Sequence, residues 1–130
     1  MAPADQCRIL VVDDVPDNIF LLQAILEVEG YNVDTADCGS AALTQIQASL
    51  PDLVLLDIMM PDLDGYEVTR QIRQNQTASH LPIILITAYE QSNRNEGIAA
   101  GANEFICKPI DFEELLAVIQ RYCSTPPHPA

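Results

Sequence analysis

Four of the five apolar runs in this chain end in side chains that can bind a metal or an anion. The first run ends in the carboxylates of Asp13 and Asp14, and the central run ends in Asp57. A later run ends in the hydroxyl of Thr87, and a short one ends in the ammonium group of Lys108. If these runs are parallel strands, the five side chains share the carboxyl edge of one sheet, where open α/β folds bind their ligands.

Together these side chains predict a site for phosphoryl transfer. Three carboxylates at one edge repel one another unless a cation joins them, and oxygen ligands of this kind suit Mg²⁺. The metal and Lys108 would stabilise charge on a phosphoryl group while Asp57 attacks in line, so an aspartyl phosphate is the expected product. Each residue alone is more often a turn residue, a helix cap or a solvated charge. Their occurrence at successive strand ends favours the functional interpretation.

The elements that must position this site alternate along the chain. The apolar runs are short, which is typical of strands in a parallel sheet covered by helices on both faces. The segments between them have helical periodicity and are long enough for right-handed crossovers. The sequence therefore predicts a doubly wound (βα)5 sandwich around one parallel sheet. The predicted strands lie at 8–12, 32–36, 53–56, 82–87 and 103–107.

The predicted helices differ in the strength of their signals. Pro16 suits the first turn of the first helix, and Gly30 falls where a C-cap glycine belongs. Asp111 and Glu114 form an acidic capping pair for the last helix. The segment 91–100 is the weakest, because two Asn and one Gly are poor helix formers. In the first helix, the residues predicted to face the core are Leu21, Leu22, Ile25 and Val28.

The composition fits a single acidic domain. The chain has 130 residues, 48% of them apolar, which is enough for one core. Nineteen acidic against six basic residues give a formal net charge of −13, which argues against nucleic acid and anionic membranes as partners. No apolar run approaches the ~20 residues of a membrane helix, and no signal peptide is visible. We expect a cytoplasmic protein, monomeric or weakly dimeric.

The ends of the chain and the cysteines carry weaker signals. Residues 1–7 are predicted to be a disordered lead-in, 8–123 the folded domain, and 124–130 a Pro-rich tail or the start of a linker. The cysteines show neither a CxxC pair nor metal-ligand spacing. All four are therefore predicted to be free thiols in a reducing compartment. They are Cys7, Cys38, Cys107 and Cys123.

Short motifs at the predicted strand ends and in the loops complete the pattern. They are Ile-Leu-Val-Val-Asp-Asp at 9–14, Leu-Leu-Asp-Ile-Met-Met-Pro at 55–61 with Gly65, Leu-Ile-Thr-Ala at 85–88, Ala-Gly-Ala at 100–102 and Phe-Ile-Cys-Lys-Pro at 105–109. As a set they resemble the receiver domain of two-component response regulators, over roughly residues 8–122. The resemblance implies a flavodoxin-like fold whose five-stranded parallel sheet has the order 2-1-3-4-5.

The resemblance also implies who supplies the phosphoryl group and what holds the metal. Asp57 would be the phosphoacceptor for a histidine kinase or a phosphotransfer protein, so the chain would be a signalling phosphoacceptor and not an enzyme. Asp14, Asp57 and the backbone carbonyl of Met59 would bind Mg²⁺ directly. Asp13 would bind the metal through water.

A second group of residues would hold the phosphoryl group and pass on the signal. By the same resemblance, Thr87, Ala88 and Lys108 would bind the phosphoryl oxygens, and Phe105 would be the aromatic switch residue that turns inward. A new hydrogen bond from Thr87 is worth about 1.5–3 kcal/mol, enough to shift a two-state equilibrium roughly ten- to a hundredfold. The expected output surface is the face formed within residues 91–122.

Met59 and Tyr89 are predicted to slow the loss of the phosphoryl group. In the family resembled, these positions flank the phosphoryl group. Neither side chain offers a carboxylate or an amide to orient a water molecule. A long-lived phosphorylated form is therefore expected, unless Tyr89 merely packs on the surface.

Three other functions share parts of this pattern. A haloacid-dehalogenase-type phosphatase would need a second Asp at the position of Met59. A flavodoxin-like flavin binder would need a hydroxyl- and glycine-rich loop after the first strand, where Asp13 and Asp14 stand. A degenerate receiver that only binds partners would lack part of the site, and every expected residue is present.

Overall fold

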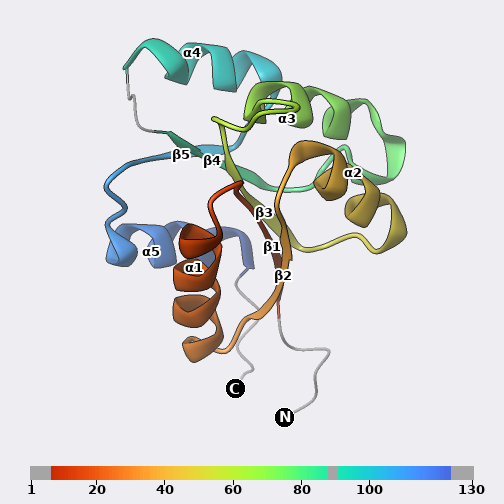
Figure 1. The fold of residues 1–130 in the computed structure, drawn as a ribbon. Helices are drawn as coiled ribbons and strands as arrows, with labels where there is room; N and C mark the ends of the chain where they lie inside the picture. The colour runs from red at the N-terminus through yellow and green to blue at the C-terminus, as the bar shows by residue number, and fades with distance from the viewer. Residues whose placement is uncertain (1–6, 88–90, 124–130) are drawn as a thin grey trace.

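The fold is a parallel sheet between two layers of helices. The computed structural model describes residues 7–87 and 91–123, with the backbone alone described for 91–94. The sheet has five parallel strands in the order β2-β1-β3-β4-β5 (Figure 1), which confirms the predicted architecture and strand order. The strands are β1 (Arg8–Val12), β2 (Asn32–Ala36), β3 (Leu53–Asp57), β4 (Ile83–Thr87) and β5 (Glu104–Cys107).

Helices α1 and α5 cover one face of the sheet, and α2, α3 and α4 cover the other (Figure 1). Within the described ranges, no helix combines the length and apolar character needed to cross a bilayer. The weak segment 91–100 does form a helix, α4. The helices are α1 (Pro16–Val28), α2 (Gly39–Ala48), α3 (Gly65–Gln74), α4 (Gln91–Ala100) and α5 (Phe112–Cys123), with a short 3₁₀ helix, η2 (Gln76–Ala78), after α3.

Each buried strand supplies side chains to two separate cores. In β1, Leu10 and Val12 join the core under α2 and α3, whereas Ile9 and Val11 join the core under α1 and α5. Successive side chains of a strand point to opposite faces, so a strand covered on both sides must be apolar at every position. This requirement explains the uninterrupted apolar runs of β1, β3 and β4.

The predicted core-facing side of helix α1 is right in part: the prediction for Leu22 is confirmed, and those for Leu21 and Val28 are wrong. Leu22 and Leu26 are buried, whereas Leu21 is 48% and Val28 is 83% exposed. Apolar residues occur on nearly every side of this helix, so periodicity alone does not select the buried stripe. The predicted end of the helix is confirmed: Gly30 has φ +95°, which favours glycine, directly after the C-cap residue.

Cys7 and Cys123 are bonded to each other, so the prediction of four free cysteines is wrong for this pair. Cys38 and Cys107 are free thiols. Cys7 is buried, so it belongs to the folded domain and not to the lead-in. The predictions for residues 1–6 and 124–130 lie outside the described residues.

Arg73 joins two loops to the end of α3. Its guanidinium donates hydrogen bonds to the backbone oxygens of Gly101, Ser79 and Leu81 at 2.9, 3.2 and 2.7 Å. It also donates to the side-chain oxygen of Asn103 at 2.8 Å. The end of α3, the η2 loop and the turn before β5 are therefore held by a single side chain.

Candidate functional site

The strand register brings the predicted site residues to one edge of the sheet. β3 lies between β1 and β4, and its last residue, Asp57, pairs with Ile86 just before the end of β4. Asp13 and Asp14 directly follow β1 on the other side. Each of the three acidic residues places a carboxylate oxygen within 4.8 Å of the others. The acidic cluster predicted from the sequence is thus formed.

Asp57 is the most constrained carboxylate of this cluster. Its side chain is almost fully buried, at 3% exposure, and its Oδ1 lies 3.6 Å from Nζ of Lys108. Nothing in the described part of the chain donates a hydrogen bond to this oxygen. Burial, and then the charge of Asp13, raise the pKa of Asp57 to about 6, although Lys108 and a backbone hydrogen bond from Met59 lower it. The positive charge of Lys108 therefore does not offset the burial of Asp57 and the negative charges beside it.

Asp13 is held in place by the first turn of α1. Its Oδ1 accepts a hydrogen bond from the Val15 backbone at 2.9 Å, and its Oδ2 accepts one from the Asn18 amide at 3.2 Å. Asn18 was not among the residues predicted for the site. An amide in the first turn of the helix that follows an acidic pair is the signal that could have found it.

The donor set fits a hard divalent cation. It consists of three carboxylates, and one of them, Asp57, has a buried oxygen to which no described residue donates a hydrogen bond. Carboxylate oxygens are ligands that Mg²⁺ prefers. A cation would also relieve the repulsion that raises the pKa of Asp57. Asp13, Asp14 and Asp57 are the residues that could hold it. The carbonyl of Met59 remains a predicted fourth ligand.

Thr87 and Lys108 flank the acidic cluster from the ends of β4 and β5. Thr87 is buried, and its carbonyl accepts a hydrogen bond from the Lys108 backbone at 2.7 Å, which joins the two strand ends. The hydroxyl, the ammonium group and the Asp57 carboxylate are thereby assembled from three strands. Ala88 and Tyr89, predicted to bind and to cover a phosphoryl group, lie outside the described residues.

Phe105 points into the core between β5 and α4. Its side chain is 7% exposed and packs directly against Gly97, where a Cβ atom would overlap the ring. The same Cβ would lie 3.0 Å from Cδ1 of Leu85. The glycine that weakens α4 as a helix therefore makes room for the inward position of the ring.

The loop that follows Asp57 is fastened to the start of α2. The carboxylate of Asp62 accepts hydrogen bonds from the backbone of Gly39 and Ser40, both at 3.0 Å, and from the Ser40 hydroxyl at 2.9 Å. These donors hold the pKa of Asp62 well below its usual range. The loop carrying Met59 is thus anchored on both sides, by β3 and by α2.

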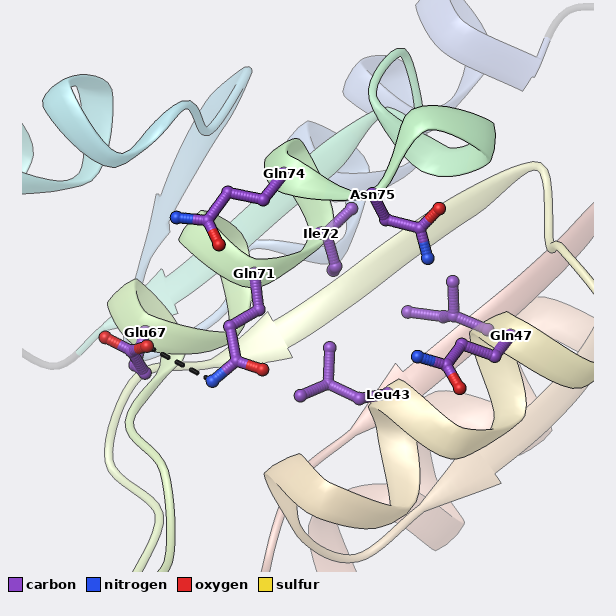
Figure 2. A pocket seen from close by; sticks show the side chains of 8 residues that line it. Leu43, Gln47, Glu67, Gln71, Ile72, Gln74 and Asn75 are labelled. Carbon is purple, nitrogen blue, oxygen red and sulfur yellow. Dashed lines mark hydrogen bonds between the residues drawn. The ribbon is translucent and has the colours of Figure 1, made fainter.

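Two hollows of the described part of the chain differ from the acidic cluster in their lining. A cavity of about 320 Å³ between α1 and the β5–α5 loop borders the cluster and is lined by Leu21, Leu22 and Phe112 as well as Asp13 and Lys108. A groove of about 450 Å³ between α2 and α3 is lined by four amide side chains and by apolar residues that include Leu43 and Ile72 (Figure 2). Its one carboxylate, Glu67, accepts a hydrogen bond from Gln71 at 3.1 Å. The acidic edge therefore remains the candidate site.

The fold and the acidic edge define a class of flavodoxin-like domain with a cluster of carboxylates at the carboxyl ends of its strands. The sequence model of the response regulator receiver domain matches residues 9–120. The chain therefore belongs to the receiver-domain family of two-component response regulators.

Relatives and solved structures agree on the family. The chain is 45% identical over 114 residues to the response regulator PleD of Caulobacter vibrioides; the match covers 87% of this chain and 25% of that protein. The chain thus spans about a quarter of this curated relative. A putative response regulator from Chloroflexus aurantiacus has a TM-score of 0.88 at 33% identity, covering 92% of this chain and 98% of that one.

A third similarity bears on the site. The receiver domain of the sensor histidine kinase PA1611 from Pseudomonas aeruginosa has a TM-score of 0.85 at 34% identity, with 92% of this chain and 98% of that chain covered. That structure has a magnesium ion coordinated in its active site cleft. In the present chain the acidic cluster lies at the carboxyl edge of the sheet.

Proposed function

We propose that the chain is a phosphoacceptor that takes a phosphoryl group onto Asp57 from a phosphohistidine. The observation that carries this proposal is the buried Oδ1 of Asp57, which has no hydrogen-bond donor in the described ranges and faces Lys108 at 3.6 Å. Because no described residue donates a hydrogen bond to this oxygen, its lone pairs are available for attack on phosphorus.

The transfer step follows from the positions of the side chains. An Asp57 oxygen forms a bond to phosphorus while the bond from phosphorus to the donor nitrogen breaks, and the histidine leaves with that electron pair. Lys108 lies where it can balance the charge of the phosphoryl oxygens, and Thr87 is the nearby hydroxyl donor. Bound Mg²⁺, held by Asp13, Asp14 and Asp57, would neutralise the same charge. The chain itself is the phosphoryl acceptor and is consumed stoichiometrically, so it is not an enzyme.

The surface of α1 supports a protein as the donor. Phe20 is 75% exposed, and the next residue, Leu21, is 48% exposed and lines the cavity that Lys108 and Asp13 also line. Two neighbouring exposed apolar side chains beside the site offer a contact surface to another protein, whereas a single one would carry no such meaning. We assign this surface to the kinase or phosphotransfer protein, and the face formed within residues 91–122 to the output partner.

The proposal is tested by intact-mass spectrometry after incubation with acetyl phosphate. The wild-type chain is expected to gain one phosphoryl group in Mg²⁺ and much less in EDTA, and the Asp57→Asn variant should gain none. Glu113→Gln, an exposed carboxylate on α5, is the matched control and should behave as the wild type. Equal labelling of Asp57→Asn and wild type would contradict the assignment of the acceptor.

A further inference from the structure

The two cysteines at opposite ends of the described domain lie against each other. Cys7 directly precedes β1, Cys123 is the last residue of α5, and 116 positions separate them in the sequence. Their Cα atoms are 5.7 Å apart, within the usual range for bonded cysteines. We propose that Cys7 and Cys123 form a thiol-modification site, a reversible redox pair that reacts with small-molecule disulfides such as oxidised glutathione.

The pairing is specific because the two partners are placed by different parts of the fold. The carbonyl of Cys7 accepts a hydrogen bond from the Asn32 backbone at 3.0 Å, which fixes this residue as an extension of the sheet. Cys123 is carried to it by α5, whose Leu115 and Ile119 are fully buried in the same core. Cys38 precedes α2 and is a free thiol, so it does not compete for either partner.

The reaction balances as a two-step thiol–disulfide exchange. A thiolate of the pair attacks oxidised glutathione, and one glutathione leaves as a thiol while a mixed disulfide forms. The second cysteine then attacks the mixed disulfide and releases the other glutathione. The two cysteines lose two electrons and two protons in total, and one oxidised glutathione becomes two reduced molecules.

The position of the pair makes the bond reversible without unfolding the domain. Both side chains are almost fully buried, so exchange requires the last turn of α5 to open. Helix ends open at low cost because their last carbonyls lack intrahelical partners. When the bond is reduced, Leu115 and Ile119 still hold α5 on the sheet, so the expected change is confined to the end of the helix.

The redox pair is independent of the phosphoryl site. Cys7 precedes the first residue of β1 and Asp13 follows its last, so the length of the strand separates the two chemistries. Oxidation should therefore leave phosphorylation of Asp57 unchanged. It should lock the end of α5, which lies within the proposed output face.

The first experiment measures the pairing in the full chain. The protein is equilibrated in mixtures of reduced and oxidised glutathione, quenched with acid, alkylated and analysed by intact mass and peptide mapping. Wild type and the Cys38→Ser/Cys107→Ser variant are expected to lose two alkylation sites together, with one peptide joining Cys7 to Cys123. A map that shows only glutathione adducts, or a bond to Cys38 or Cys107, would overturn the proposal.

The second experiment measures the effect on α5. Hydrogen exchange of residues 116–123 is expected to be about tenfold slower in the oxidised than in the reduced wild-type chain. Cys7→Ser and Cys123→Ser should show no redox dependence, and two variants are used so that loss of folding in one is recognised. Asp57→Asn should keep the full redox response, so failure of the phosphoacceptor assignment would be told apart. Equal exchange rates in both states of the wild type would refute the lock.

Discussion

At the scale of single residues, the buried carboxylate of Asp57 should make the metal-free domain sensitive to pH. Its pKa is raised from 3.8 to about 6, so the folded state favours the neutral carboxyl. The stability contributed by that neutral form is present below the unfolded value of 3.8 and is lost as pH rises through about 6.

Asp57→Asn removes this dependence because an amide does not titrate. In EDTA we expect the variant to be more stable than wild type by about 2–3 kcal/mol at pH 8, with the difference closing between pH 6 and pH 4. Urea unfolding across this pH range measures it, and Mg²⁺ should stabilise wild type but not the variant. A stability difference that grew as pH fell would contradict a raised pKa of Asp57 in the folded state.

The residues of the site could be predicted from the local sequence pattern. The residue that supports Asp13 could not. Asp13, Asp57, Thr87 and Lys108 each follow an apolar run, so a strand prediction places them at the edge of the sheet. Asn18 contacts Asp13 through a turn of helix whose rotation the sequence did not settle. Its role appeared only when the orientation of α1 was known.

At the scale of elements, α1 shows where periodicity fails. A helix with apolar residues on most sides offers several equivalent stripes, and the predicted stripe included Leu21 and Val28, which are exposed. The packing of Leu22 and Leu26 into the core under α1 and α5 selects the stripe that is buried. Leu21, an exposed residue of the predicted stripe, lines the cavity that borders the site.

Phe20→Gln tests the exposed face of α1 as the donor surface. A phosphohistidine-bearing protein that phosphorylates the wild-type chain should transfer to the variant about tenfold more slowly, since apolar contact area is lost. Labelling by acetyl phosphate should stay unchanged. Ile98→Gln, an exposed apolar residue on α4, is the control and should transfer at the wild-type rate. Equal slowing with both reagents would indicate damage to the site instead of to docking.

Gly97→Ala tests the packing between α4 and Phe105. Alanine gains about 1 kcal/mol in helix propensity, but its Cβ overlaps the ring, and overpacking costs about 1–3 kcal/mol. We expect a net loss of roughly 1 kcal/mol in the free energy of unfolding and a shifted NMR signal from the Phe105 ring. Asn95→Ala, exposed on the same helix, should be stabilising instead. A Gly97→Ala chain as stable as Asn95→Ala would mean that the ring has space to spare.

Across the molecule, contacts between residues far apart in the sequence could not be predicted. The alternation of strands and helices is a local pattern and was predicted correctly. The cap that Asp62 provides to Ser40 spans 22 positions, and the Cys7–Cys123 bond spans 116. Such contacts leave no periodic signal, because either partner could be placed elsewhere without changing the local pattern.

Substitution of Arg73 should destabilise the end of α3 and the two loops that it contacts at the same time. Lys at this position cannot reproduce a planar fork that reaches four oxygens. Arg73→Lys should therefore reduce the free energy of unfolding by about 1–2 kcal/mol, since part-buried backbone acceptors lose a charged donor. Arg70→Lys, half-exposed and paired with Glu67 and Glu96, is the matched control and should change it by less than about 0.5 kcal/mol. Chemical denaturation measures the free energy of unfolding of both variants. Equal losses would show that Arg73 contributes no more to stability than the exposed Arg70.

The closeness of Cys7 and Cys123 also makes the domain a portable unit. The Cα atoms of the first and last residues of segment 7–123 are 5.7 Å apart, which is close to the distance between the two ends of a tight turn. Residues 7–123 could therefore be spliced into a surface loop of another protein without spreading the two ends of that loop. A host built in this way would carry the acidic edge on the side of the insert away from the junction, because β1 runs from the junction toward Asp13.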